Sequence, residues 1–269
     1  MKKFFENYGK FIVTAIVMII LLSLINPLGA TIKNYVLNTP VPEPEFTLTQ
    51  NSAMLSNEEN YVGYYADVDN DGKIDGVICF DYGYYPGYSL TVNSDKITVE
   101  PKMTTNLASY KLKTVEGQDN VVVRKESGED RFYVMALADV PGKWYWYKKG
   151  RATAGLRKNF GMGETNTQAM KEIWDNEEWG VQYEKDIWSN TFDNWFVPST
   201  DELKVSFYLL QTVAPAIFTS IVYWDQNTLY WTSSLPQMAY ASAVCGFVFY
   251  SKTIHMNTET ALLRLFTTY

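Results

Sequence analysis

Four aspartates within nine residues are the side chains of this sequence with the clearest chemical potential. Asp67, Asp69, Asp71 and Asp75 occupy positions one, three, five and nine of a loop that has Gly72 at position six. This spacing is typical of calcium-binding loops, in which hard oxygen ligands converge on the ion and the glycine permits a sharp turn. The same residue types also suit the turn of a solvated β-hairpin. The sequence therefore leaves two interpretations open, a calcium site and a plain turn.

The twelfth position of this loop limits the kind of calcium site that it could form. It is Ile78, whereas a helix–loop–helix calcium site has a glutamate there that binds the ion with both oxygens. The flanking segments also have the composition of strands rather than of helices. Any calcium bound here would therefore occupy a looser hairpin site of low affinity.

The sequence offers few groups for catalysis. His255 is the only histidine, and the nucleophile motif G-x-S-x-G does not occur. An enzyme built on this chain would need an acid/base pair such as Asp186 with Asp201 or Glu202. Glu202, however, follows Ser199 by three residues, a spacing that assigns both to the start of a helix. We therefore expect a protein that is not an enzyme.

Aromatic residues are dense, with 20 Tyr, 14 Phe and 8 Trp, and this composition favours strands over a helical bundle. On a strand, alternation would place Trp144 and Trp146 on one face. That face could pack in the core or form a stacking platform for a sugar or a peptide. Trp195 and Trp231 are expected to pack in the core.

The N-terminus has the features of a membrane anchor. Residues 11–24 contain no charge, and the apolar stretch continues to residue 30, which is about the length that crosses a bilayer. Lys2, Lys3 and Lys10 precede it and predict a cytoplasmic N-terminus with the remaining chain outside the cell. A cleaved signal peptide ending near Ala30 is the alternative, and either interpretation exports the protein.

Charge argues against one class of partner. The net charge is −7, and because residues 1–33 carry +3, the rest of the chain carries −10. Such an acidic ectodomain is a poor binder of nucleic acid.

The two cysteines, Cys79 and Cys245, are too few for a disulfide scaffold and lack the spacing of a metal site. Each lies in an apolar run, where a buried free thiol is the commoner outcome, although a disulfide stays open.

The exported part is expected to begin with a stalk and a strand-rich region. After a cytoplasmic tail and transmembrane anchor over residues 1–33, alternating prolines at positions 40, 42 and 44 predict an extended stalk over 34–50. The strand-rich region, 51–130, contains the aspartate loop as a hairpin between strands over 61–66 and 74–80. Further strands are expected over 121–124 and 131–137.

Two helices are expected in the remaining chain. Asn166 or Thr167 could cap one over residues 168–178. The second has the clearer start, because Ser199 and Glu202 form a capping box and Pro215 would end the helix near residues 212–213. The tail returns to strands, expected over 229–233, 243–250 and 261–266.

Three motifs in a fixed order resemble those of bacterial DUF1566-type domains. The first is a W-x-x-P-S/T-x-x-E-L/W element over residues 195–203, and the second is a Y-W-S/T-S-S/T element over 230–234. The third is a closing arginine-containing strand around Arg264. The resemblance covers about residues 136–266 and implies a domain over 131–269 related to C-type-lectin-like and formylglycine-generating-enzyme-like folds. The two cysteines cannot form the usual lectin disulfides, and the usual calcium-sugar motifs of lectins do not occur.

The fold class expected is therefore α+β: a transmembrane helix followed by a strand-rich ectodomain that ends in a C-type-lectin-like domain. Such domains display loops for recognition, and the segment 235–255 would form part of that face. The expected function is a membrane-anchored, non-catalytic bacterial surface protein, an adhesin or lectin-like protein that binds an extracellular glycan or protein. A structural subunit of a pilus or envelope assembly is the alternative. The candidate ligand-binding residues are Trp144, Trp146, Tyr240, Tyr250 and His255.

Overall fold

The computed structural model describes residues 46–47, 59–92, 95–100, 106–146, 156–174, 194–222, 225, 227–237, 240–246, 249–255 and 258–269. The chain divides into two units, 1–45 and 46–269, and all described residues belong to the second. The expected membrane anchor and most of the expected stalk therefore lie outside the described residues. Within the described ranges, no helix is long and apolar enough to cross a membrane.

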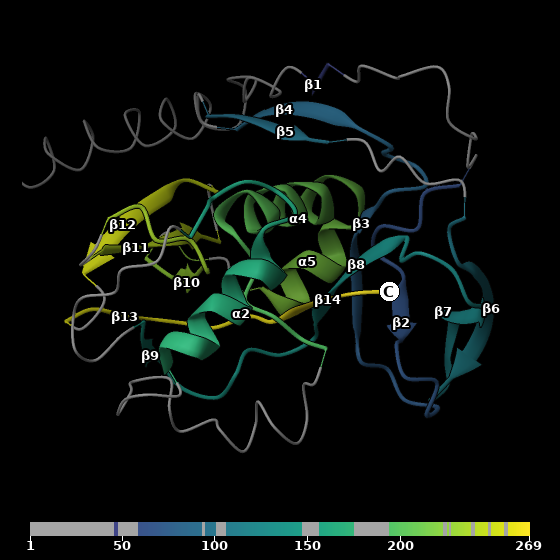
Figure 1. Cartoon of the computed structure of the whole chain (residues 1–269). Helices are drawn as coiled ribbons and strands as arrows, with labels where there is room; N and C mark the ends of the chain where they lie inside the picture. Colours follow the sequence, from purple (N-terminus) through teal and green to yellow (C-terminus); the bar gives the residue numbers. More distant parts are fainter. Residues whose placement is uncertain are drawn as a thin grey trace, which may run out of the picture. The chain divides into compact units, whose positions relative to one another are not determined.

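A six-stranded sheet forms the centre of the described unit (Figure 1). Only the pair β2–β7 is parallel, and all other neighbours are antiparallel. The expected domain boundary between residues 130 and 131 lies inside this sheet, because strands from both sides of it pair with one another. In spatial order the strands are β14 (Phe266–Thr268), β8 (Phe132–Ala136), β3 (Gly76–Asp81), β2 (Tyr65–Asp67), β7 (Gln118–Glu126) and β6 (Ser109–Val115).

Strand β3 shows why this sheet needs cover on both faces. All six of its residues are buried. Val77 and Cys79 belong to the main hydrophobic cluster on one face, and Ile78 belongs to a second cluster on the other. A bulge between Ile78 and Phe80 shifts the register, so that Phe80 also enters the main cluster.

Three smaller sheets accompany the large one. They are the three-stranded sheets β10–β11–β12 and β1–β4–β5 and the pair β13–β9. Residues 46–47, at the end of the expected stalk, form β1 and pair with β4. The bounds are β10 (Leu229–Trp231), β11 (Tyr240–Cys245), β12 (Ser251–His255), β1 (Phe46–Thr47), β4 (Tyr88–Val92), β5 (Asp95–Val99), β13 (Thr260–Ala261) and β9 (Trp144–Tyr145).

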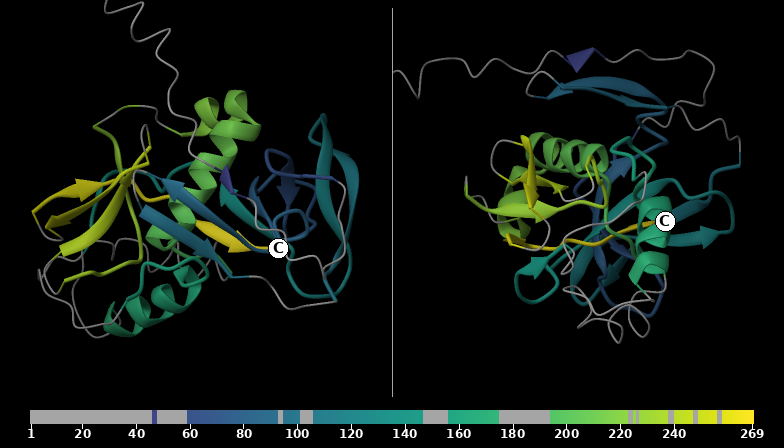
Figure 2. Two further views of the ribbon diagram at one scale, coloured as in Figure 1. Left: turned by 90° about the horizontal axis from the view of Figure 1, so that it is seen from above. Right: turned by 60° about the vertical axis from the view of Figure 1, so that its left-hand side comes forward.

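The described helices are α2 (Gly163–Trp174), α4 (Thr200–Val213) and α5 (Pro215–Ile221). Helix α4 contacts both β3 and β11. In the left view of Figure 2 it lies between the olive and yellow strands of one sheet and the blue and teal strands of the other. Its residues Leu203, Phe207 and Leu210 are fully buried in the main cluster. The core is therefore a helix held between two sheets, and the α+β, strand-rich class is confirmed.

Several local predictions are confirmed. The hairpin forms, with β2 and β3 antiparallel around the aspartate loop. The capping box forms as well, and α4 ends at Val213, before Pro215. Cys79 and Cys245 are buried free thiols, and Trp231 is buried in the core.

Other boundaries differ from the prediction. Helix α2 begins at Gly163, five residues before the expected start, and the expected end over 175–178 lies outside the described residues. The strand expected over 243–250 begins at Tyr240 and ends at Cys245, and β12 follows it. The strand expected over 261–266 is interrupted between β13 and β14. There, Leu263 and Leu265 bond through their carbonyls to the amides of Val140 and Ala136 instead of continuing a ladder.

Candidate functional site

The aspartate loop brings three of its four carboxylates together. One oxygen each of Asp67, Asp69 and Asp71 lies within 4.8 Å of the others. Gly72 has a φ of +87°, a conformation that favours glycine, and its amide donates to Asp67 Oδ2 at 3.1 Å. Asp75 lies outside this group and accepts from the amide of Val68 at 2.7 Å.

Asp67 differs from its neighbours because it is buried. Its exposed fraction is 1%, whereas Asp69 and Asp71 are exposed. Its second oxygen, Oδ1, is also buried and has no hydrogen-bond partner among the described residues. A buried carboxylate oxygen without a partner costs free energy, which a bound cation would recover.

The electrostatics of the loop reflect crowding of negative charge. Burial raises the pKa of Asp75, and the carboxylates of Asp69 and Asp67 raise it further, against the lowering effect of the Val68 amide. The exposed Asp71 is held by Lys73, whose ammonium lies 2.8 Å from Asp71 Oδ2 and lowers the pKa of that carboxyl. A cation at the loop would therefore have to share Asp71 with Lys73. Three clustered carboxylates with one orphaned oxygen suit a hard cation with oxygen ligands.

The two tryptophans of the expected stacking face differ in accessibility. Trp146 is buried, and its indole N–H donates to the carbonyl of Thr232 at 2.8 Å. Trp144 is half-buried against the cluster that contains Trp146. Strand β9 covers only Trp144 and Tyr145, so the alternation expected over 144–147 does not extend through Trp146. Trp146 therefore serves the core, as the alternative interpretation had it.

The remaining candidate residues lie on the sheet β10–β11–β12. Tyr240 and His255 are cross-strand partners, and their rings meet edge to face at 5.1 Å. Tyr250 precedes β12, and its neighbour Ser251 pairs with Val244 near the other end of β11. The structure thus brings Tyr240 and His255 together and leaves Tyr250 apart from them.

The two described carboxylates considered for catalysis are buried at the start of α4. Glu202 is fully buried, and burial raises its pKa to about 7. It accepts from the amide of Ser199 at 2.6 Å and from those of Gly161 and Gly163 at 3.0 and 3.2 Å. Asp201 is also buried, which raises its pKa to about 6. Asp186 lies outside the described residues.

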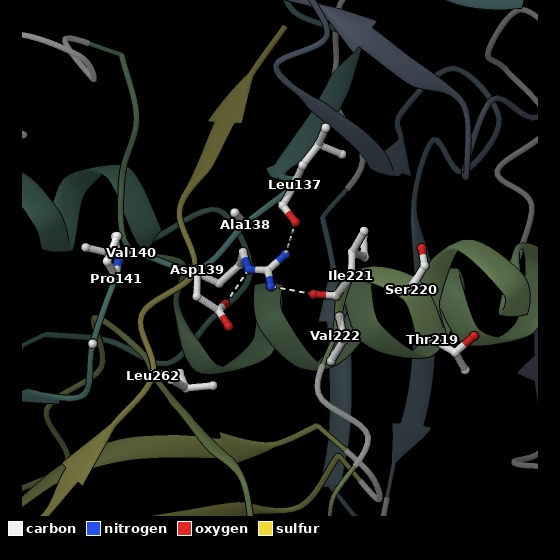
Figure 3. Close-up of a pocket in the computed structure, with 12 residues that line it drawn as sticks. Leu137, Ala138, Asp139, Val140, Pro141, Thr219, Ser220, Ile221, Val222 and Leu262 are labelled. Carbon is white, nitrogen blue, oxygen red and sulfur yellow. Dashed lines mark hydrogen bonds and ion pairs between the residues drawn. The ribbon is translucent and has the colours of Figure 1, made fainter. Parts of the chain in front are cut away.

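Arg264 organises a pocket of about 480 Å³ beside α5 (Figure 3). Its guanidinium donates to Asp139 Oδ1 at 2.6 Å, to the carbonyls of the last residue of β8 and of the residue after it, and to the carbonyl of Ile221. The hydroxyls of Thr219 and Ser220 bond back to carbonyls of their own helix. Apart from the orphaned Asp139 Oδ2, the polar side chains of this pocket are therefore engaged in holding the fold.

A second pocket, of about 340 Å³, has a very different lining. Seven of its nine residues are polar, and Trp195 and Phe196 supply aromatic surface. No residue of this pocket was among the candidates from the sequence, because the lining comes from four segments that are distant along the chain. The lining residues are Asp130, Glu164, Thr167, Gln168, Asn194, Trp195, Phe196, Thr267 and Thr268.

Comparison with known proteins adds no relative: no family model matches the sequence, and neither the curated proteins nor the solved structures give a match. The resemblance to DUF1566-type domains therefore rests on the three motifs alone.

Proposed function

We propose that this chain is a membrane-anchored bacterial surface protein whose lectin-like ectodomain binds an extracellular glycan or protein without catalysing a reaction. We further propose that calcium stabilises its aspartate loop. The anchor follows from the apolar N-terminal segment and its preceding lysines. The ectodomain's role follows from the ordered motifs, and the calcium from the geometry of the loop.

The observation that carries the calcium proposal is the orphaned oxygen of Asp67. Its partner oxygen is held by the Gly72 amide, and the carboxylates of Asp69 and Asp71 lie within 4.8 Å. Calcium would supply the missing partner and relieve repulsion among the three charges. Because position twelve of the loop is Ile78 and not a glutamate, we expect a dissociation constant on the order of 10⁻⁴–10⁻³ M. Calcium at extracellular concentrations can still occupy such a site.

Melting curves of the full chain with calcium, magnesium or chelator test this proposal. At calcium about tenfold above the dissociation constant, the free energy of unfolding should rise by about 1.4 kcal/mol, or ~3–5 °C in Tm. Magnesium should substitute poorly because it demands tighter octahedral geometry. The double variant Asp69→Ala, Asp71→Ala should lose the response. Asp119→Ala, which changes an exposed aspartate near the start of β7, should keep it. An equal calcium response in wild type and double variant would identify the loop as a plain turn.

Surface location and ligand binding have separate tests. Protease added to intact cells should remove residues 46–269, and full protection would contradict the proposed topology. The purified full chain should bind members of a glycan and extracellular-protein array. Silence across the array would instead favour the structural role in a pilus or envelope assembly.

A further inference from the structure

Hydrogen bonds and an ion pair join the segments that line the polar pocket beside Trp195. Asp130 forms an ion pair with Arg124 and accepts from the hydroxyl of Thr268 at 2.6 Å. The hydroxyl of Thr167 accepts from the amide of Val197 at 2.9 Å, and the hydroxyl of Thr267 donates to the carbonyl of Asn194 at 2.9 Å. These bonds join α2, β14 and the segment before α4 around the opening. The cavity therefore does not depend on a single loose loop.

Three polar side chains at this pocket remain available. Glu164 and Gln168 lie one turn apart on α2, and Asn194 enters from the segment before α4. All three are exposed, and within the described part of the chain their side chains have no hydrogen bond or ion pair. A carboxylate accepts hydrogen bonds, and each amide both donates and accepts them. Together they suit a ligand whose groups both donate and accept hydrogen bonds.

We propose that the pocket formed by Glu164, Gln168, Asn194 and Trp195 binds a neutral sugar ring through adjacent hydroxyl groups. This inference rests on the proposed ligand-binding function and names its site and ligand class. Each sugar hydroxyl donates one hydrogen bond and accepts others, which suits the mixed amide and carboxylate lining. Trp195 is half-buried against two hydrophobic clusters, and the part of it that lines the pocket offers a small apolar contact for the C–H groups of the ring.

The charge and the volume of the pocket limit the classes of ligand that it could bind. Asp130 is balanced by Arg124, so among the residues that the structure describes Glu164 leaves the pocket with one negative charge that no cation pairs. An anionic sugar or a phosphate would be repelled. A lone exposed carboxylate also gives little attraction for a lysine side chain. The volume of about 340 Å³ lies at the small end of ligand pockets, which suits one or two sugar rings rather than a folded partner.

Saturation-transfer NMR on the full chain, with calcium present, tests the inference. The probes are the methyl glycosides of glucose, galactose, mannose and N-acetylglucosamine. At least one should bind, with a dissociation constant on the order of 10⁻³ M. Gln168→Ala and Asn194→Ala should each weaken it about five- to tenfold, the effect of one lost hydrogen bond. Gln211→Ala, the same change on α4 outside the pocket, should leave binding unchanged. All three side chains are at least partly exposed, so the variants should fold normally.

The outcomes separate this inference from the proposed function. Absence of binding by all four glycosides, or binding that is indifferent to Gln168→Ala and Asn194→Ala, overturns the sugar site. Binding of N-acetyl-lysine methylamide that is lost in Glu164→Gln, with no sugar bound, also overturns it and assigns the pocket to a cation. If the Gln168→Ala, Asn194→Ala double variant still binds members of the array, the proposed surface-binding function is supported, but the pocket is not its ligand site. If no member of the array binds while a glycoside binds at the pocket, the sugar site is supported and the proposed extracellular ligand is wrong.

Discussion

Glu202 shows how a single buried residue can join two helices. Its carboxylate closes the capping box of α4 and also accepts from Gly163, the first residue of α2. Both helix N-termini therefore direct their positive ends at one carboxyl group. Gly163 leaves room for this contact, because a Cβ there would lie 2.2 Å from Glu202 Oε2. The same enclosure removes water, and burial raises the pKa of Glu202 from 4.5 to about 7.

This pKa predicts a pH dependence with a definite sign. A folded-state pKa of about 7 against an ordinary 4.5 means that the folded protein holds the proton more tightly. The resulting stabilisation is fully present below pH 4.5 and is lost as the pH rises through 7, by about 1–3 kcal/mol. Urea unfolding between pH 4.5 and 7.5 measures it. Glu202→Gln cannot titrate, so its stability should fall less over this range than that of the wild type. If the free energy of unfolding changes equally with pH in the wild type and in Glu202→Gln, the raised pKa is contradicted.

At the scale of single elements, the start of α4 was predictable because its signal is local. Ser199 and Glu202 are three residues apart and satisfy one another. The start of α2 was mispredicted because its expected caps work elsewhere. Asn166 bonds through its side chain to both backbone groups of Arg157, and the Thr167 hydroxyl bonds to Val197. Polar residues that suit a cap were used for tertiary contacts, which sequence spacing does not reveal.

Ser199→Ala should destabilise the protein more than an ordinary surface serine would. Its hydroxyl accepts from the amide of Glu202 at 3.3 Å and donates to the carbonyl of Asn159 at 2.8 Å. The loss should be about 1–2 kcal/mol, in the upper half of the range for a helix cap. Denaturant midpoints measure it, with Ser220→Ala on the exposed face of α5 as the matched control. A loss no larger than that of the control would show that the cap contributes little.

At the scale of the whole described unit, the two candidate sites differ in how far the sequence could reveal them. The aspartate loop is contiguous, so its residues were predictable even though the burial of Asp67 was not. The sugar pocket combines Asp130, α2, residues 194–196 and β14. These parts meet only in the folded chain, where the segment before α4 pairs with β14 at Phe196 and Phe266, and no spacing along the chain encodes this meeting.

Tyr269 connects these two sites. Its hydroxyl donates to the carbonyl of Asp67 at 2.9 Å and accepts from the amide of Arg124. The guanidinium of Arg124 lies 5.0 Å from the centre of the Tyr269 ring and pairs with Asp130 at the pocket. One buried side chain thus holds both the strand that leads into the aspartate loop and the arginine that pairs with Asp130 at the pocket.

Tyr269→Phe should weaken both the fold and its response to calcium. Removing the hydroxyl leaves the carbonyl of Asp67 and the amide of Arg124 without their partner, at a cost of about 1–3 kcal/mol. With Asp67 less firmly placed, calcium should raise Tm by less than in the wild type. Because each variant is compared with itself in calcium and in chelator, general destabilisation does not mimic this effect. Tyr145→Phe, at an exposed tyrosine of β9, should retain the full calcium response. If Tyr269→Phe also retains it, the loop binds calcium independently of the sheet behind it.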